Sequence, residues 1–209
     1  MSLSPPRKRR KEARPSELMA AALDLFVEKG YAATRLEDIA ARAGVSKGTL
    51  YLYFDSKEAL FKAVIQEGVL PVLAENEAIA AGHTGSSFAL LELMLDNWWA
   101  RIGQTAFAGI PKLMVAEAMN FPEVAQYYYD SVIVRARALI GQALERGMQS
   151  GEFRRMNVET AIDVMIAPLL MLLIWRHSFG CCQSPAIVPR EYLALHLDLL
   201  RQGLLTSRL

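Results

Sequence analysis

The chain has little of what catalytic and disulfide-stabilised proteins require. Its only cysteines, Cys181 and Cys182, are adjacent and offer no disulfide framework. We expect them to be buried or loop thiols, with redox sensing as the alternative. The three histidines are scattered, and no nucleophile–base spacing, phosphate-binding glycine loop or metal-ligand cluster occurs. The sequence therefore predicts no enzyme, no cofactor and no metal site.

Long apolar segments are also scarce. The longest uninterrupted apolar run, residues 164–175, contains a proline and is too short to span a bilayer. The basic N-terminus is not followed by the apolar segment of a secretory signal, so we expect a cytoplasmic protein. No strand-like alternation and no internal repeat stand out among the 209 residues, 53% of which are apolar. These observations predict an all-α fold.

Positive charge is concentrated at one end of the chain. Residues 1–62 hold 12 Lys and Arg against 8 Asp and Glu, whereas the remainder holds 11 against 14. We expect residues 1–15 to form a flexible basic arm, in which Arg7, Arg9 and Arg10 contact DNA phosphates or the minor groove. The alternative is a solubilising tail without defined contacts.

Residues 34–57 carry the pattern of a helix-turn-helix. Thr34 and Glu37 have the spacing of a capping box that opens a helix. Gly44 stands where that helix must end and turn sharply, since glycine tolerates a left-handed conformation. Ser46 is a good cap for a second helix, and Ser56 for a third. The alternative is three ordinary helices with solvated ends.

The second of these helices has the features of a DNA-recognition helix. Its first turn and flanks offer groups able to contact base edges or phosphates, while Leu50 and Phe54 are expected to face inward. The expected DNA-binding residues, besides the three arginines of the arm, are Thr34, Arg35, Ser46, Lys47, Gly48, Thr49, Tyr51, Tyr53 and Lys57.

At these residues the chain resembles the TetR family of bacterial transcriptional regulators. The resemblance covers about residues 16–65, LMAAALDLFVEKGYAATRLEDIAARAGVSKGTLYLYFDSKEALFKAV. It implies a helical homodimer with an N-terminal DNA-binding domain and a larger ligand-binding domain. Leu52 departs from the family, where many members carry tyrosine or another polar residue. The segment LMVAEAMNFPEVAQYYYDSVIVRA also looks like the C-terminal domain of AcrR-like multidrug-efflux repressors.

The domain boundaries follow from this reading of the motif. We expect a three-helix DNA-binding domain at 16–62, with its first helix beginning at Ser16, and a helical ligand-binding and dimerisation domain at 63–209. A connecting helix is expected from Ser56 to about Asn76, with a break near Pro71. Later helices are expected at about 86–102, 110–120, 122–150, 158–177 and 190–205.

The larger domain is expected both to bind a ligand and to form the interface with a second subunit. Methionine and aromatic residues suit an adaptable site for a hydrophobic or aromatic effector. The expected ligand-binding residues are Met94, Trp98, Trp99, Met114, Glu117, Phe121, Tyr127 and Tyr128. The two last helices have broad apolar faces that predict a four-helix interface between two subunits. Its expected residues are Ile162, Met165, Ile166, Leu169, Leu173, Leu193, Leu197, Leu200 and Leu204. Plain core packing is the alternative for both sets.

The sequence thus favours a ligand-responsive regulator that binds a palindromic double-stranded DNA operator and is released by a small hydrophobic effector. A transcriptional activator of the same fold is one alternative. An architectural DNA-binding protein is another, although it would not need a hydrophobic half larger than the DNA-binding half.

Overall fold

The computed structural model describes residues 7–182 and 184–206, with side chains from residue 14 onwards. Helices dominate this part of the chain, and within it no β-strand forms. One isolated antiparallel bridge pairs Phe153 with Leu205. The all-α prediction is confirmed.

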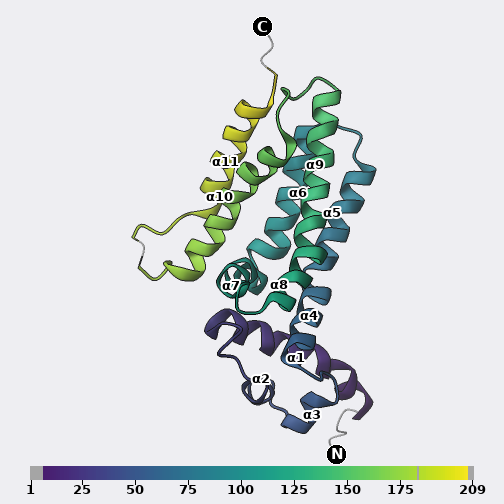
Figure 1. The fold of residues 1–209 in the computed structure, drawn as a ribbon, viewed down its shortest axis with the longest axis vertical. Coiled ribbons are helices and arrows are strands. Elements are labelled where there is room, and N and C mark those ends of the chain that lie inside the picture. Colours follow the sequence, from purple (N-terminus) through teal and green to yellow (C-terminus); the bar gives the residue numbers. More distant parts are fainter. Residues whose placement is uncertain (1–6, 183, 207–209) are drawn as a thin grey trace, which may run out of the picture.

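The N-terminal unit consists of α1 (Arg7–Lys29), α2 (Leu36–Arg42), α3 (Lys47–Tyr51) and α4 (Lys57–Gly68). It forms the lower part of the molecule in Figure 1. Helix α1 begins at Arg7 rather than Ser16, so the flexible arm predicted for residues 1–15 is wrong from Arg7 onwards. Pro15 lies inside the helix and removes one backbone donor. The lysine, arginine and alanine around it favour helix. The side chains of Arg7, Arg9 and Arg10 lie outside the described residues.

The larger unit stands on the first and consists mainly of long helices (Figure 1). Its α-helices are α5 (Leu70–Gly82), α6 (Ser87–Trp98), α7 (Ile110–Glu117), α8 (Pro122–Tyr128), α9 (Val134–Gln149), α10 (Val158–Ser178) and α11 (Pro189–Leu204). The expected connecting helix is broken at Val69, between α4 and α5, and Pro71 occupies the first turn of α5. A proline fits there because first-turn amides need no helical partner.

Two expected helices end in or contain irregular turns. Helix α6 continues into a π-helical turn, Trp99–Gly103, followed by a short 3₁₀ turn, Ala106–Gly109. A second π-helical turn, Tyr129–Ile133, joins α8 to α9. Such turns are rare and occur frequently at functional sites. Both follow aromatic residues that we expect to bind a ligand.

The hydrophobic interior divides into two clusters. The first joins α1–α5 to α7, α8 and the second π-helical turn, and includes Phe26, Phe61 and Leu113. The second lies farther from the N-terminal unit, among α6, α9, α10 and the end of α11, around Leu144 and Ile162. The first cluster therefore crosses the boundary between the two units, so that they share one packed interior.

Helix α10 is long and apolar enough, by length and composition alone, to cross a membrane. The helix is longer than the apolar run at residues 164–175, whose length led us to predict that no segment spans a bilayer. In its most apolar part, 22% of the helix is buried. One such helix is weak evidence for a span, because a core helix passes the same test.

The predicted dimer face is wrong for five of its nine residues. Ile162, Met165, Leu173, Leu193 and Leu204 are buried within the subunit, so they are unavailable to a partner. Ile166, Leu169, Leu197 and Leu200 are half-buried. The exposed large apolar residues of these two helices are Val164, Met171, Trp175, Leu195 and Leu199. The sequence shows two apolar helices but does not say which side of each packs on its own subunit.

Candidate nucleic-acid interface

The turn between α2 and α3 has the geometry that its residues predict. Gly44 has φ +66°, in the left-handed region that favours glycine. The Ser46 hydroxyl accepts the amide of Thr49 at 3.1 Å and lies 2.9 Å from the Thr49 hydroxyl. Leu50 is fully buried and Phe54 packs on the same core. The turn, its cap and its two anchors are thus confirmed, and they hold α3 at a set angle to α2.

Helix α3 presents an exposed surface of mixed chemistry. Ser46, Lys47, Gly48 and Tyr51 are exposed, and Thr49 is half-buried. Leu52 follows the helix and is 80% exposed, so a large apolar side chain lies on this surface without packing in the core. Hydroxyls and an ammonium suit phosphates and base edges, and an exposed apolar group suits a thymine methyl.

Lys47 shares its charge with the preceding helix. Its ammonium forms an ion pair with Glu37 of α2 and lies 5.7 Å from the centre of the Tyr51 ring. This pairing raises the pKa of Lys47 and lowers the pKa of Glu37. Both side chains are exposed, so the pair is weak and can open toward a phosphate.

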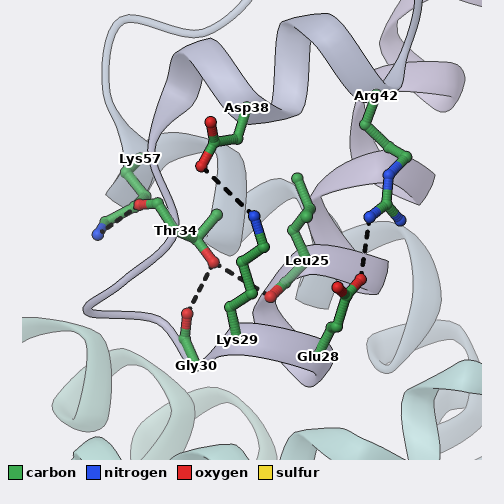
Figure 2. A network of polar contacts seen from close by, with 8 residues as sticks. All are labelled: Leu25, Glu28, Lys29, Gly30, Thr34, Asp38, Arg42 and Lys57. Atoms are coloured by element: carbon green, nitrogen blue, oxygen red, sulfur yellow. Dashed lines mark hydrogen bonds and ion pairs between the residues drawn. The ribbon is translucent and has the colours of Figure 1, made fainter.

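Thr34 has a different role from the two that we predicted. Thr34 is 1% exposed, and its hydroxyl lies 2.7 Å from the Gly30 carbonyl and 3.1 Å from the Leu25 carbonyl. Figure 2 shows the hydroxyl directed toward both carbonyls. Helix α2 begins at Leu36, with Arg35 at its N-cap and no side-chain cap. The capping box is therefore wrong. Thr34 instead ties the α1–α2 loop to the end of α1, because its short hydroxyl matches buried carbonyls.

Lys57 is likewise directed inward. Its ammonium donates to the carbonyls of Tyr31, Ala32 and Thr34 at 2.6, 3.3 and 3.0 Å. It also lies 4.5 Å from the centre of the Tyr31 ring. Partial burial lowers the pKa of Lys57, while the Glu117 carboxylate opposes that shift. With its donors on three carbonyls, Lys57 closes the loop and does not offer a free charge to DNA.

Two ion pairs brace α2 against α1 (Figure 2). Lys29 lies 3.8 Å from Asp38, and Arg42 lies 2.9 Å from Glu28. Exposed pairs of this kind contribute little stability each. They do orient the first helix of the motif. Of the other predicted DNA contacts, Arg35 is exposed, whereas Tyr53 is half-buried and packs on the core.

The larger unit contacts the loop between α1 and α2 through α7 and the start of α8. The Glu117 carboxylate of α7 accepts the Ala32 amide at 3.0 Å. Phe121, just before α8, packs its ring edge-on against Tyr31, with centroids 4.7 Å apart. Gly30 has φ +89°, and a side chain there would approach the Glu117 carboxylate to 3.2 Å. No local pattern predicts this junction, because 85 residues separate Ala32 from Glu117.

The expected ligand-binding residues do not line one common cavity. Met114, Glu117 and Phe121 line a crevice at this junction with Tyr31 and Phe61, too narrow to hold a water molecule. Trp98, Tyr127 and Tyr128 pack on the same core cluster, while Met94 belongs to the second. The Trp99 ring lies under the guanidinium of Arg176, 5.6 Å from its centre. A larger open groove of about 410 Å³ lies elsewhere, between α9 and α10 around Arg137.

A braced helix-turn-helix, joined to a larger helical unit through its first loop, defines a DNA-binding transcriptional regulator with a helical C-terminal domain. Residues 18–64 match the model of the bacterial regulatory proteins of the tetR family. Residues 82–179 match the tetracyclin repressor-like C-terminal domain. The chain belongs to the TetR family.

Individual relatives agree with this assignment. The chain is 28% identical to the HTH-type transcriptional repressor KstR2 of Rhodococcus jostii, over 90% of this chain and 91% of that protein. It is 49% identical to the HTH-type transcriptional regulator RutR of Escherichia coli over 52% of this chain and 55% of that protein. The fold matches that of the regulator FadR from Bacillus subtilis, in complex with stearoyl-CoA, with a TM-score of 0.71 at 20% identity over 90% and 98% of the chains. The narrower resemblance to AcrR-like efflux repressors stays a prediction.

Proposed function

We propose that this protein is a cytoplasmic, homodimeric repressor that leaves a palindromic operator when a small hydrophobic effector binds. The observation that carries the proposal is the junction at Ala32. The same loop that leads into the helix-turn-helix is bonded to Glu117 and packed on Phe121 of the larger domain. A shift of α7 or α8 is therefore passed to α2 and α3 without an intervening flexible segment.

The exposed surface of α3 supplies the proposed DNA contacts. We assign base or phosphate contacts to Lys47, Thr49 and Tyr51, with Ser46, Gly48 and Arg35 at the edges, and contacts from the N-terminal arginines to the backbone. Leu52 adds an apolar contact. Thr34 and Lys57 support the loop and make no direct contact.

The proposed partner is a second copy of the chain. Val164, Met171 and Trp175 lie at intervals of seven and four residues along α10, and Leu195 and Leu199 lie four apart on α11, so each set follows one helix face. Two such faces bury each other in a two-fold four-helix arrangement. The paired recognition helices then reach successive major grooves, roughly 34–36 Å apart.

The proposed effector site lies where the aromatic residues meet the π-helical turns. Trp98 precedes the first turn and Trp99 begins it, and Tyr127 and Tyr128 precede the second. A side chain at Gly103 would come within 2.1 Å of the Trp99 ring, so this indole is packed directly on backbone. The complex of FadR with stearoyl-CoA supports an acyl or similarly apolar effector class. The crevice at the Ala32 junction, lined by Met114, Glu117 and Phe121, is too narrow for a water molecule, so a ligand that enters it must open it.

Selection of binding sites from random duplex DNA tests the function. We expect one palindrome, protected by a dimer in footprinting, and release by a subset of lipophilic compounds found in a thermal-shift screen. Broad protection without a palindrome indicates an architectural protein. A reporter placed behind the selected site separates repression from activation, because only a repressor lowers expression in the absence of effector.

A further inference from the structure

The turn that follows α10 places two thiols side by side at the surface. Cys181 and Cys182 are both exposed, and their sulfur atoms lie 3.4 Å apart. The Cys182 amide donates to the Phe179 carbonyl at 2.9 Å, so the two cysteines occupy the last positions of a hydrogen-bonded four-residue turn. The thiols are thus held by backbone geometry and are open to solvent.

Gly180 makes this turn possible. A side chain at this position would approach the backbone carbonyl of Arg176 to 2.6 Å, and a backbone atom cannot move aside as a flexible side chain can. Phe179 caps α10, with its amide on the Trp175 carbonyl at 2.8 Å. Its ring is 52% exposed and gives the same turn an apolar surface.

The spacing of the sulfur atoms fits a bridging atom better than a direct bond. Adjacent Cα atoms are about 3.8 Å apart, whereas disulfides usually join Cα atoms about 4.4–6.8 Å apart. An atom bonded to both sulfurs at about 2.3 Å, a typical metal–thiolate length, would subtend roughly 95° at this separation. A bridging atom therefore needs little movement of the turn.

The sulfur–atom–sulfur angle and the number of protein ligands limit which kinds of atom can bridge the two thiols. A linear two-coordinate ion with the same bonds would need sulfurs about 4.6 Å apart. A tetrahedral zinc site needs four ligands, and the described residues contain no group of three or more His, Cys, Asp or Glu placed to hold a metal. A pyramidal, three-coordinate atom that binds two soft thiolates and already carries its third substituent fits both the angle of roughly 95° and the two available sulfur ligands.

We propose that Cys181 and Cys182 form a chelating site for monosubstituted trivalent arsenicals. With an aryl arsine oxide, two arsenic–sulfur bonds form while the arsenic–oxygen double bond is lost. The two thiol protons leave with that oxygen as one water molecule, and arsenic remains trivalent. This site is independent of the proposed regulatory function, and its test needs no operator.

Titration of the full-length protein with phenylarsine oxide, followed by intact-mass measurement, tests the site. We expect one arsenical per subunit, displaced by a small dithiol but not by an equal concentration of a monothiol. Cys181→Ser and Cys182→Ser should each weaken binding at least tenfold. Both positions are exposed and serine has a similar shape, so the variants should keep the wild-type circular dichroism and melting temperature.

Two results would overturn the proposal. One is that the wild-type chain takes up no arsenical. The other is that either single-serine variant binds it as tightly as the wild type, which would mean that one thiol suffices and no chelate forms.

Discussion

The ring of Phe121 meets the ring of Tyr31 edge-on, 4.7 Å away at an angle of 72°. Tyr31 belongs to the loop that leads into the helix-turn-helix, and Phe121 to the start of α8. Lys57 lies over both rings, 4.5 and 5.7 Å from their centres. Contacts among one cation and two aromatic rings thus connect α4, the α1–α2 loop and the start of α8, which belong to both domains.

The hydrogen bond from Ala32 to Glu117 should protect the Ala32 amide. We expect Glu117→Ala to speed hydrogen exchange at Ala32 about tenfold or more, because the amide loses its acceptor, and to lower the free energy of unfolding by about 1–3 kcal/mol. Glu117→Gln keeps an acceptor and should have a smaller effect. The exposed Glu67→Gln serves as the matched control, and equal exchange in all variants would remove Glu117 from the junction.

Thr34 should affect stability and not DNA contact. Thr34→Val removes the hydroxyl, so the buried contact to the Leu25 carbonyl and the part-buried contact to the Gly30 carbonyl are lost, at a cost of about 1–3 kcal/mol in urea unfolding. Thr34→Ser keeps the hydroxyl and should recover most of the loss. If the folded Thr34→Val protein binds DNA as tightly as the wild type, the supporting role holds. A selective loss of DNA affinity at unchanged stability would restore the direct contact that we first predicted.

Lys47 and Glu37 should have opposite effects on DNA binding. Lys47→Ala removes a cation from the surface of α3 and should cost on the order of 1–3 kcal/mol on the selected operator if it contacts a base. Glu37→Gln frees the lysine and removes a nearby negative charge, so binding should tighten. Fluorescence anisotropy at several salt concentrations measures both. Equal losses for Lys47→Ala on operator and random DNA would reduce Lys47 to a phosphate contact.

Dimer formation should depend on the outer stripe of α10 and not on the predicted residues that are buried within the subunit. Trp175→Glu places a charge in the proposed interface and should convert the dimer into a folded monomer in sedimentation experiments. Met119→Glu changes an apolar residue that is 95% exposed away from this stripe and should leave the dimer intact. A Trp175→Glu protein that remains dimeric would place the interface elsewhere.

Tyr31 should make the protein sensitive to alkali. Burial, assisted by the Glu58 carboxylate, raises the pKa of Tyr31 to about 12 from its ordinary value of 10. The folded protein therefore keeps the proton where the unfolded chain loses it, so this stabilisation is complete below pH 10 and is lost as pH rises toward 12. Urea midpoints should fall over this range in the wild type. Tyr31→Phe keeps the ring, so its midpoints should fall less.

Local patterns were sufficient for the helix-turn-helix. Gly44, Ser46 and Ser56 act on amides and dihedral angles within a few residues of themselves, so their sequence context alone predicts their roles. Pro71 marked the break between α4 and α5 for the same reason. The capping box failed because Thr34 is buried with its hydroxyl on the Leu25 and Gly30 carbonyls, and Arg35 takes the N-cap position of α2.

The amino-acid sequence by itself determined that this protein is helical, that it carries a helix-turn-helix and that its larger half is rich in apolar and aromatic side chains. Only the tertiary structure decided which of those side chains are buried and which are exposed. Packing directs Leu173 and Leu193 inward and Trp175 outward, and it brings Glu117 to a loop 85 residues away. Helical periodicity reveals an apolar face, but the choice of neighbour for that face depends on how all the helices fill one volume.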